Sequence, residues 1–200
     1  MDKEEILRDV EIIKEVFQKT NIYFSNYYPW YMLWGALIVL ATSVHQYFLL
    51  SEISTLRISL IWIIFAVVGA AGSAIIGKLI GKKENKRDFT SMGRIQLLLW
   101  GATTLAIILT VLLSVVWGVY GEEYIVVFIL LITGVTLVSF GVFLYKPSLY
   151  LGFLCFPVAI AMLYFPVWQP VLFGMLIGGG YFVIGTLDYF QNKRDVYGRE

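Results

Sequence analysis

Charged residues are scarce in this chain, and their scarcity excludes a water-soluble fold. Asp, Glu, Lys and Arg make up 14% of the 200 residues, whereas hydrophobic residues make up 59% and the mean hydropathy is +0.78. Soluble domains carry about 25% charged and about 45–50% apolar residues, and a domain of this size buries only about 70% of the surface of its unfolded chain. We therefore expect an integral membrane protein.

Cysteine and histidine are each present once, as Cys155 and His45. A single cysteine excludes a disulfide within the chain, and the two residues are too few for a Cys/His metal cage. No serine lies in a nucleophile-elbow setting, and His45 has no histidine partner. We predict no enzymatic activity, no cofactor and no metal, and the net charge of +1 gives no pull toward nucleic acid.

Long apolar runs are abundant, and six of them have about the 20 residues that a spanning helix needs. The runs are continuous and do not alternate with polar residues, which favours helices over barrel strands. The expected spans are residues 29–50, 58–77, 95–121, 124–145, 148–165 and 167–190. The predicted fold is an all-α bundle of six transmembrane helices in residues 23–190, between an amphipathic helix in residues 1–22 and a tail in residues 191–200.

Basic residues predict the orientation, because positively charged loops stay in the cytoplasm. With six spans, fourteen of the fifteen Lys and Arg residues fall on one side of the membrane, and only Arg57 falls on the other. We expect a multi-pass protein of the cell membrane with both ends in the cytoplasm.

A faint internal repeat indicates three helical hairpins. The sequence Leu-Trp-Gly-Ala occurs at residues 33–36 and 99–102, near the starts of the first and third spans. Two glycine pairs recur at a spacing of seven residues, Gly134 with Gly141 and Gly178 with Gly185. Such repeats are related by an axis along the membrane normal. Chance matches among glycine-rich runs are the alternative.

Glycine also predicts where helices pack closely, because backbones approach where side chains are absent. The glycines expected at helix contacts are Gly134, Gly141, Gly174, Gly178 and Gly185. The face with Gly174 and Gly178, a GxxxG pair, is expected to be the tightest contact in the bundle or else a subunit interface. Pro157 removes a backbone hydrogen bond from the fifth helix and predicts a kink, with a hinge as the functional interpretation.

Hydroxyl side chains run through the third and fourth spans: Thr103, Thr110, Ser114, Thr136 and Ser139. In a membrane, such groups bond to backbone or to a neighbouring helix. Alternatively, they line a pathway for a small neutral solute. Both interpretations remain open.

A second polar set is expected at the outer face: His45, Glu52, Arg57, Glu122 and Glu123. Acids with a histidine suit a cation site or a sensor of acid pH. The alternative is a group of solvated turn residues, with Arg57 paired to a nearby acid.

Asp188 is the charged residue nearest to the centre of a span, and charges inside a membrane are costly. One interpretation is an acid at a helix end, within two turns of Asn192 and neutralised by Lys193 and Arg194 or by Lys78. The other is a functional acid that lines a cytoplasmic vestibule.

The amino-terminal helix, residues 2–19, carries one apolar stripe and more acids than bases. Helices that lie on lipid usually present lysine and arginine, so we expect this helix to contact protein: its own bundle, a second copy of the chain, or another partner.

Two functional classes follow. The first is a non-enzymatic accessory or regulatory membrane subunit that acts through protein contact or oligomerisation. The second is a small-solute transporter, or the substrate-binding subunit of one.

Overall fold

The computed structural model describes residues 8, 11, 28–51, 55–81, 89–143 and 145–197. Apart from residues 8 and 11, the amphipathic helix expected in residues 2–19 lies outside these residues, as do residues 82–88, between the second and third spans, and the end of the tail. In the described part every regular element is a helix, and six helices are long and apolar enough to cross a membrane. The fold is an all-α bundle of six membrane helices, as the sequence predicts.

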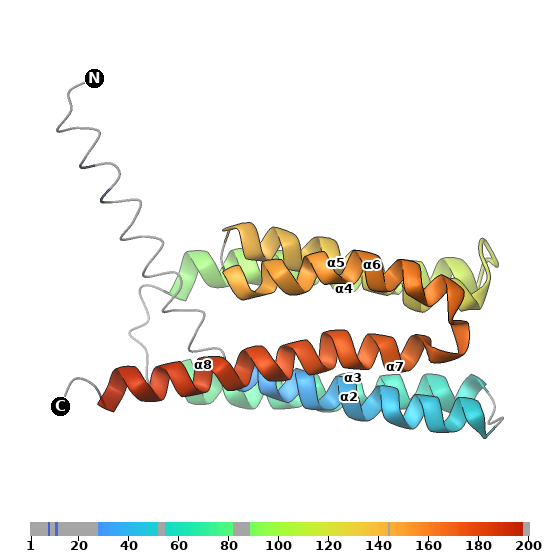
Figure 1. The fold of residues 1–200 in the computed structure, drawn as a ribbon, viewed down its shortest axis with the longest axis horizontal. Helices are drawn as coiled ribbons and strands as arrows, with labels where there is room; N and C mark the ends of the chain where they lie inside the picture. Colours follow the sequence, from blue (N-terminus) through green and yellow to red (C-terminus); the bar gives the residue numbers. More distant parts are fainter. Residues whose placement is uncertain are drawn as a thin grey trace.

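The helices run back and forth along the long axis of the molecule, which is horizontal in Figure 1. The first five spans are α2 (Tyr28–Leu50), α3 (Thr55–Gly81), α4 (Phe89–Val115), α5 (Ile125–Phe143) and α6 (Lys146–Tyr164). The last span joins α7 (Gln169–Phe173), the π-helical segment η3 (Gly174–Gly179) and α8 (Gly180–Tyr197). The 3-10 turns η1 (Glu122–Tyr124) and η2 (Pro166–Trp168) precede α5 and α7. We call the end of the bundle where α6 begins the Lys146 end, and the opposite end, where η1 lies, the Glu122 end.

The third span ends earlier than expected, because α4 ends at Val115 and not near residue 121. Gly118 takes a φ of +60°, which L-residues with a side chain rarely adopt. The amides of Gly118 and Val119 bond to the carbonyls of Ser114 and Leu113, at 3.0 Å each. A glycine-dependent turn therefore closes the helix within an apolar stretch that shows no such break.

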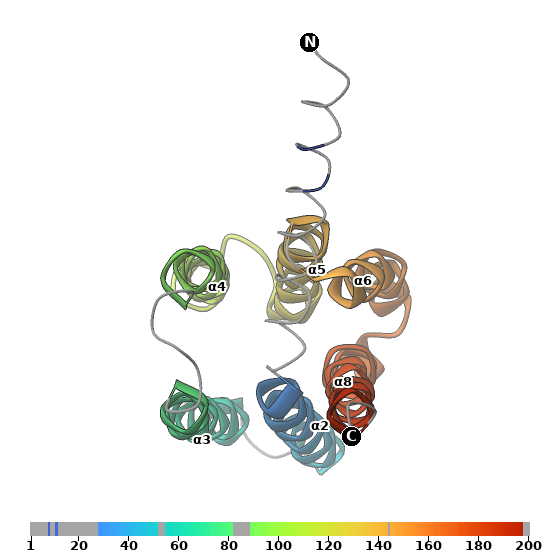
Figure 2. The ribbon, with the colours of Figure 1, turned by 90° about the vertical axis from the view of Figure 1, so that its left-hand side faces the viewer.

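The spans form two layers (Figure 2). One layer contains α3, α2 and α8, and the other contains α4, α5 and α6, with α2 and α5 in the middle. The most extensive contacts lie within the layers: α5 packs on α6, and α2 packs on α3 and along η3 and α8. The pairs α2–α3 and α4–α5 thus pack as hairpins. The short turn between α6 and α7 carries the chain from one layer to the other.

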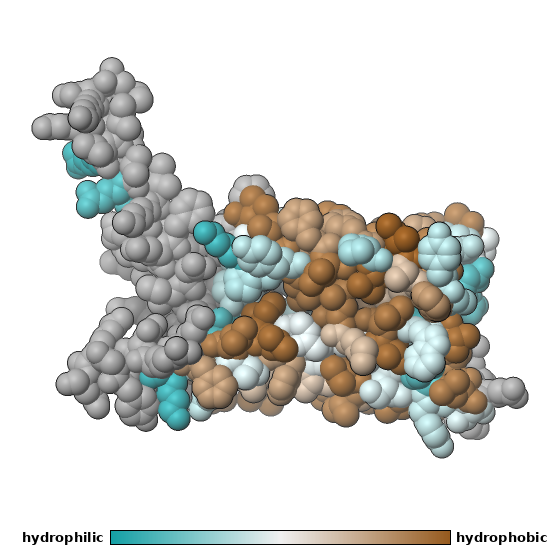
Figure 3. Space-filling model, viewed as in Figure 1, coloured by the Kyte–Doolittle hydropathy of each residue, from teal (hydrophilic) through white to brown (hydrophobic). Residues whose placement is uncertain are grey.

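Buried apolar side chains of α5, α6 and the last span make one core, with Leu130, Leu137, Cys155, Met162 and Ile177 at its centre. The outer surface is apolar as well, and brown side chains cover most of the face in Figure 3 between hydrophilic patches at the two ends. A helix that is apolar on all sides suits a lipid environment.

Two glycine seams bring backbones together within the layers. A Cβ atom on Gly178 would lie 2.9 Å from the Val39 nitrogen, and one on Gly35 would lie 2.6 Å from the Phe182 nitrogen, so α2 and the last span touch through their backbones. In the α5–α6 seam, a Cβ atom on Gly152 would lie 2.6 Å from the Val138 nitrogen. Real Cβ atoms essentially never come this close, so only glycine fits at these positions.

Candidate functional site

A cluster of buried polar side chains lies at the Lys146 end of the bundle, where both layers meet. Tyr31 comes from α2, Tyr145 from the α5–α6 link, Ser148 from α6, and Tyr181 and Asp188 from α8. We call these five residues the tyrosine–aspartate cluster. Four of them, Tyr145, Ser148, Tyr181 and Asp188, are each at most 6% exposed. Asp188 is the one buried carboxylate in the described part of the chain.

The α5–α6 link positions Tyr145. Its backbone is extended, with φ −148° and ψ 100°, and Pro147 in the first turn of α6 favours the start of that helix. The Tyr145 amide bonds to the Phe140 carbonyl, and the Tyr145 carbonyl accepts from the Ser148 amide, both at 3.1 Å. The link therefore fixes the direction in which the phenol leaves the backbone.

The cluster joins the two layers. The Tyr145 hydroxyl donates to Oδ2 of Asp188, which lies 43 residues further along the chain. The Tyr31 ring stacks on the Tyr145 ring, with centroids 5.7 Å apart, and meets the Tyr181 ring edge-on at the same distance. One hydrogen bond and two ring contacts thus hold α2, α8 and the α5–α6 link together.

Asp188 is not a solvated acid at a helix end. It is 4% exposed, and its hydrogen-bond donor is Tyr145. Two of the expected basic partners, Lys78 and Lys193, are exposed, and the side chains of Asn192 and Arg194 lie outside the description. A buried acid needs a donor or a proton, because an unpaired charge is expensive to desolvate.

Tyr145 lies between the candidate spans Glu122–Val142 and Lys146–Tyr164. Burial, and then its hydrogen bond to the Asp188 carboxylate, raise the pKa of Tyr145 well above the ordinary value for tyrosine. The phenol therefore keeps its proton at physiological pH and remains a donor. Chemically, this arrangement supports a fixed acid–phenol hydrogen bond.

Three buried polar groups have no hydrogen-bond partner: the Ser148 hydroxyl, the Tyr181 hydroxyl and the Gln46 side-chain amide. A buried polar group without a partner costs about 1–3 kcal/mol. Two of these groups belong to the tyrosine–aspartate cluster. The third lies on α2 toward the Glu122 end.

Two of the hydroxyls expected along α4 and α5, those of Thr103 and Thr136, lie at the contact between those helices. The Thr103 and Thr136 hydroxyls are 2.7 Å apart and bond across it. Thr110 bonds to the Ala106 carbonyl at 2.8 Å, and Ser114 bonds to the Tyr120 carbonyl at 3.0 Å. Ser139, on α5, is half-buried.

The described members of the outer polar set have separate surroundings. His45 accepts a bond at Nδ1 from the Trp62 indole, at 3.2 Å, whereas Glu122 and Glu123 are exposed in the η1 turn. Glu52 and the side chain of Arg57 lie outside the described residues. Among the described residues, no three His, Cys, Asp or Glu side chains are grouped as metal ligands.

All five glycines singled out in the sequence lie at close helix contacts. Gly134 and Gly141 face α6, Gly174 faces Thr42 of α2, and Gly178 and Gly185 face the α2 backbone. Gly174, Gly178 and Gly185 of the last span therefore pack within the chain. Pro157 lies exposed inside a continuous α6, whereas the irregular helix is η3 in the last span.

The tyrosines of the cluster carry no distinctive sequence signal. Tyr31 reads as an interfacial anchor beside Tyr28 and Trp30, which is the usual role of aromatic residues there. The spacing of Tyr181 and Asp188, seven residues apart, places both on one face of α8. Comparisons with protein families, with curated proteins and with solved structures give no match for this chain.

Proposed function

We propose that this protein is a non-enzymatic subunit of the cell membrane that acts by contact, with α3 and α4 as its docking face. One observation carries the proposal. In the α3 and α4 spans only 11% and 17% of residues are buried, against 44% in the α5 span and in the last span. A bundle in which two of the four edge helices are so lightly packed has apolar surface left for a partner or a second copy.

The docking face also permits close approach. Gly101 on α4 is exposed, and no atom lies within 4 Å of the place where its Cβ would be. Ala102 beside it is also exposed. Small residues at a lipid-facing position let a second helix come close enough for dispersion contacts.

The hydrogen bonds of α4 and α5 favour contact over transport. Thr103, Thr110, Ser114 and Thr136 all bond within the chain. The pocket described in the bundle is apolar and measures about 80 Å³. A transport pathway along these helices would need hydroxyls that are free to bind a solute.

Transport of a small solute is the second candidate, and a different observation favours it. The unpartnered groups of Ser148, Tyr181 and Gln46 are buried in the bundle. Asp188, also buried, supplies a carboxylate. These are the groups to which a polar solute would bind, although they lie toward opposite ends of the bundle.

Gentle purification from native membranes, with mass spectrometry of the co-purified chains, tests the docking function. We expect a second polypeptide or a defined oligomer. The Gly101→Phe variant should lose this partner or oligomer. The control variant Gly179→Phe should keep it, although a Cβ atom on Gly179 also has no atom within 4 Å. A single polypeptide that retains a polar ligand would overturn the docking function in favour of transport.

We also propose that the Lys146 end faces the cytoplasm, on the strength of the basic residues. In intact cells, Glu122→Cys should react with a membrane-impermeant maleimide and Lys146→Cys should not. Both positions are exposed, and the natural Cys155 is buried. The reverse pattern would invert the topology. The three-hairpin repeat remains a prediction.

A further inference from the structure

The seam between α2 and α3 is tight in the half nearer to the Lys146 end. A Cβ atom on Gly69 would lie 2.5 Å from the Trp34 ring, and one on Gly72 would lie 2.8 Å from Leu33. The Trp34 indole also donates to the Ser73 hydroxyl at 3.0 Å. Glycines on α3 thus let the large side chains of α2 lie directly against its backbone.

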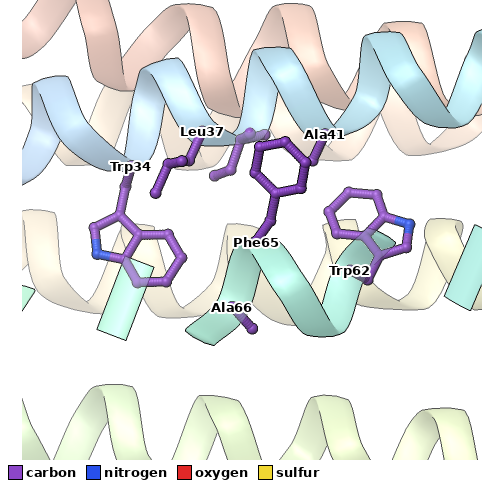
Figure 4. Close-up of a pocket in the computed structure, with 7 residues that line it drawn as sticks. Trp34, Leu37, Ala41, Trp62, Phe65 and Ala66 are labelled. Carbon is purple, nitrogen blue, oxygen red and sulfur yellow. The ribbon is translucent and has the colours of Figure 1, made fainter. Parts of the chain in front are cut away.

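The same seam opens toward the Glu122 end, where α3 carries Trp62 and Phe65 in place of glycine. These rings line an apolar pocket of about 80 Å³ between the two helices. In Figure 4, Trp34 and Trp62 stand at its two ends, and Leu37, Phe65 and Ala66 lie between them. Ala66 is exposed, so the pocket has an open side.

The pocket offers no polar group to a ligand. Its two polar side-chain atoms are the indole nitrogens, and both donate within the protein: Trp34 to Ser73, and Trp62 to His45. The lining residues of α2 lie in the middle of a 23-residue span. The pocket therefore lies near the midplane of a bilayer, where the surrounding solvent is hydrocarbon.

We propose that this pocket holds the acyl chain of a bilayer lipid. Apolar cavities stay dry, and benzene occupies a cavity of about 150 Å³, so a slot of this size suits a narrow chain better than a ring. A helix, about 10 Å across, is too wide to enter. The occupant is thus a lipid tail inserted between α2 and α3 from the open side.

Photolabelling of the full-length protein in proteoliposomes tests this site. The probe is a phosphatidylethanolamine with a diazirine at the end of one acyl chain. We expect label on Leu37 and Phe65 that survives extraction into detergent and lipid washing before irradiation. Label on the exposed Ile64 of the same helix should be lost by that washing. Equal loss of label at Phe65 and Ile64 would overturn the proposal.

A variant with a larger side chain in the pocket provides a second test of the proposal. Ala66→Leu enlarges a side chain that lines the pocket and should lose most of the wash-resistant label, whereas Ala74→Leu, at an exposed position on the same helix outside the pocket, should retain it. Undiminished label in a folded Ala66→Leu protein would contradict the site. If Ala66→Leu does not fold, the comparison of Phe65 with Ile64 in the unmodified protein still decides.

Discussion

Gly35 and Gly101 occupy the same place in two copies of one short sequence, Leu-Trp-Gly-Ala, yet their surroundings are opposite. Gly35 on α2 lies against the backbone of the last span, whereas nothing lies within 4 Å of a Cβ on Gly101 in α4. Identical local sequence therefore has two uses. The helix opposite decides whether a glycine closes a seam or leaves a face open.

The same contrast divides the whole bundle. The seams of α5 with α6 and of α2 with the last span bring backbones into contact, and the tyrosine–aspartate cluster fastens both layers at the Lys146 end. By comparison, α3 and α4 bury the smallest share of their residues. We infer that the dense part is the scaffold and the sparse part is the surface on which the protein acts.

The largest expected effect comes from exchanging the two matched glycines for leucine. Gly35→Leu forces α2 away from the Phe182 backbone and should destabilise the bundle by more than about 3 kcal/mol, at the upper end of overpacking effects. Gly101→Leu faces open space and should change stability by less than about 0.5 kcal/mol. Reversible denaturation in mixed micelles measures both. Similar losses in the two variants would remove the distinction between seam and open face.

The next effect concerns the tyrosine–aspartate cluster. Tyr145→Phe leaves the buried Asp188 carboxylate without its donor and should cost about 1–3 kcal/mol. The control Tyr164→Phe, at a position that is 75% exposed, should be nearly neutral. In a double-mutant cycle with Asp188→Asn, the two losses should not add, because the residues share one hydrogen bond. Additive losses would mean that the bond between the layers does not contribute.

The smallest effect comes from the α4–α5 hydroxyls. Thr103→Val removes one bond between helices and should cost about 0.6 kcal/mol, the average for such bonds in membrane bundles. Thr104→Val, an exposed neighbour whose hydroxyl bonds only to its own helix at Trp100, serves as the control. If Thr103→Val leaves stability unchanged but alters solute uptake into proteoliposomes, the hydroxyls serve a pathway.

Much of the fold is predictable because each span is determined by a short, continuous stretch of sequence. Each span is a continuous apolar run, and helices are the way to satisfy backbone groups in lipid, so the sequence indicates all six. The predicted end of the third span is wrong by about one and a half turns, because Gly118, whose φ is positive, ends the helix within an apolar stretch. The π-helical segment in the last span likewise cannot be recognised from the spacing of apolar residues in the sequence.

The candidate site is less predictable, because it depends on how the layers meet. Asp188 attracts notice as an acid near a span, but the local sequence offers Lys193 and Arg194 as partners. Its actual donor, Tyr145, is 43 residues away. Pairing across that distance follows from the order of helices in two layers, which hydropathy does not encode.

Site-specific photocrosslinking in native membranes tests the central claim most directly. A photoreactive residue would replace Ile64 on α3 or Leu105 on α4, and Phe153 or Ile160 on α6, four positions that are all between 56% and 59% exposed. At equal exposure, the α3 and α4 positions should yield a discrete protein adduct and the α6 positions only lipid adducts. Protein adducts from α6, or none from α3 and α4, would contradict the assignment of the docking face.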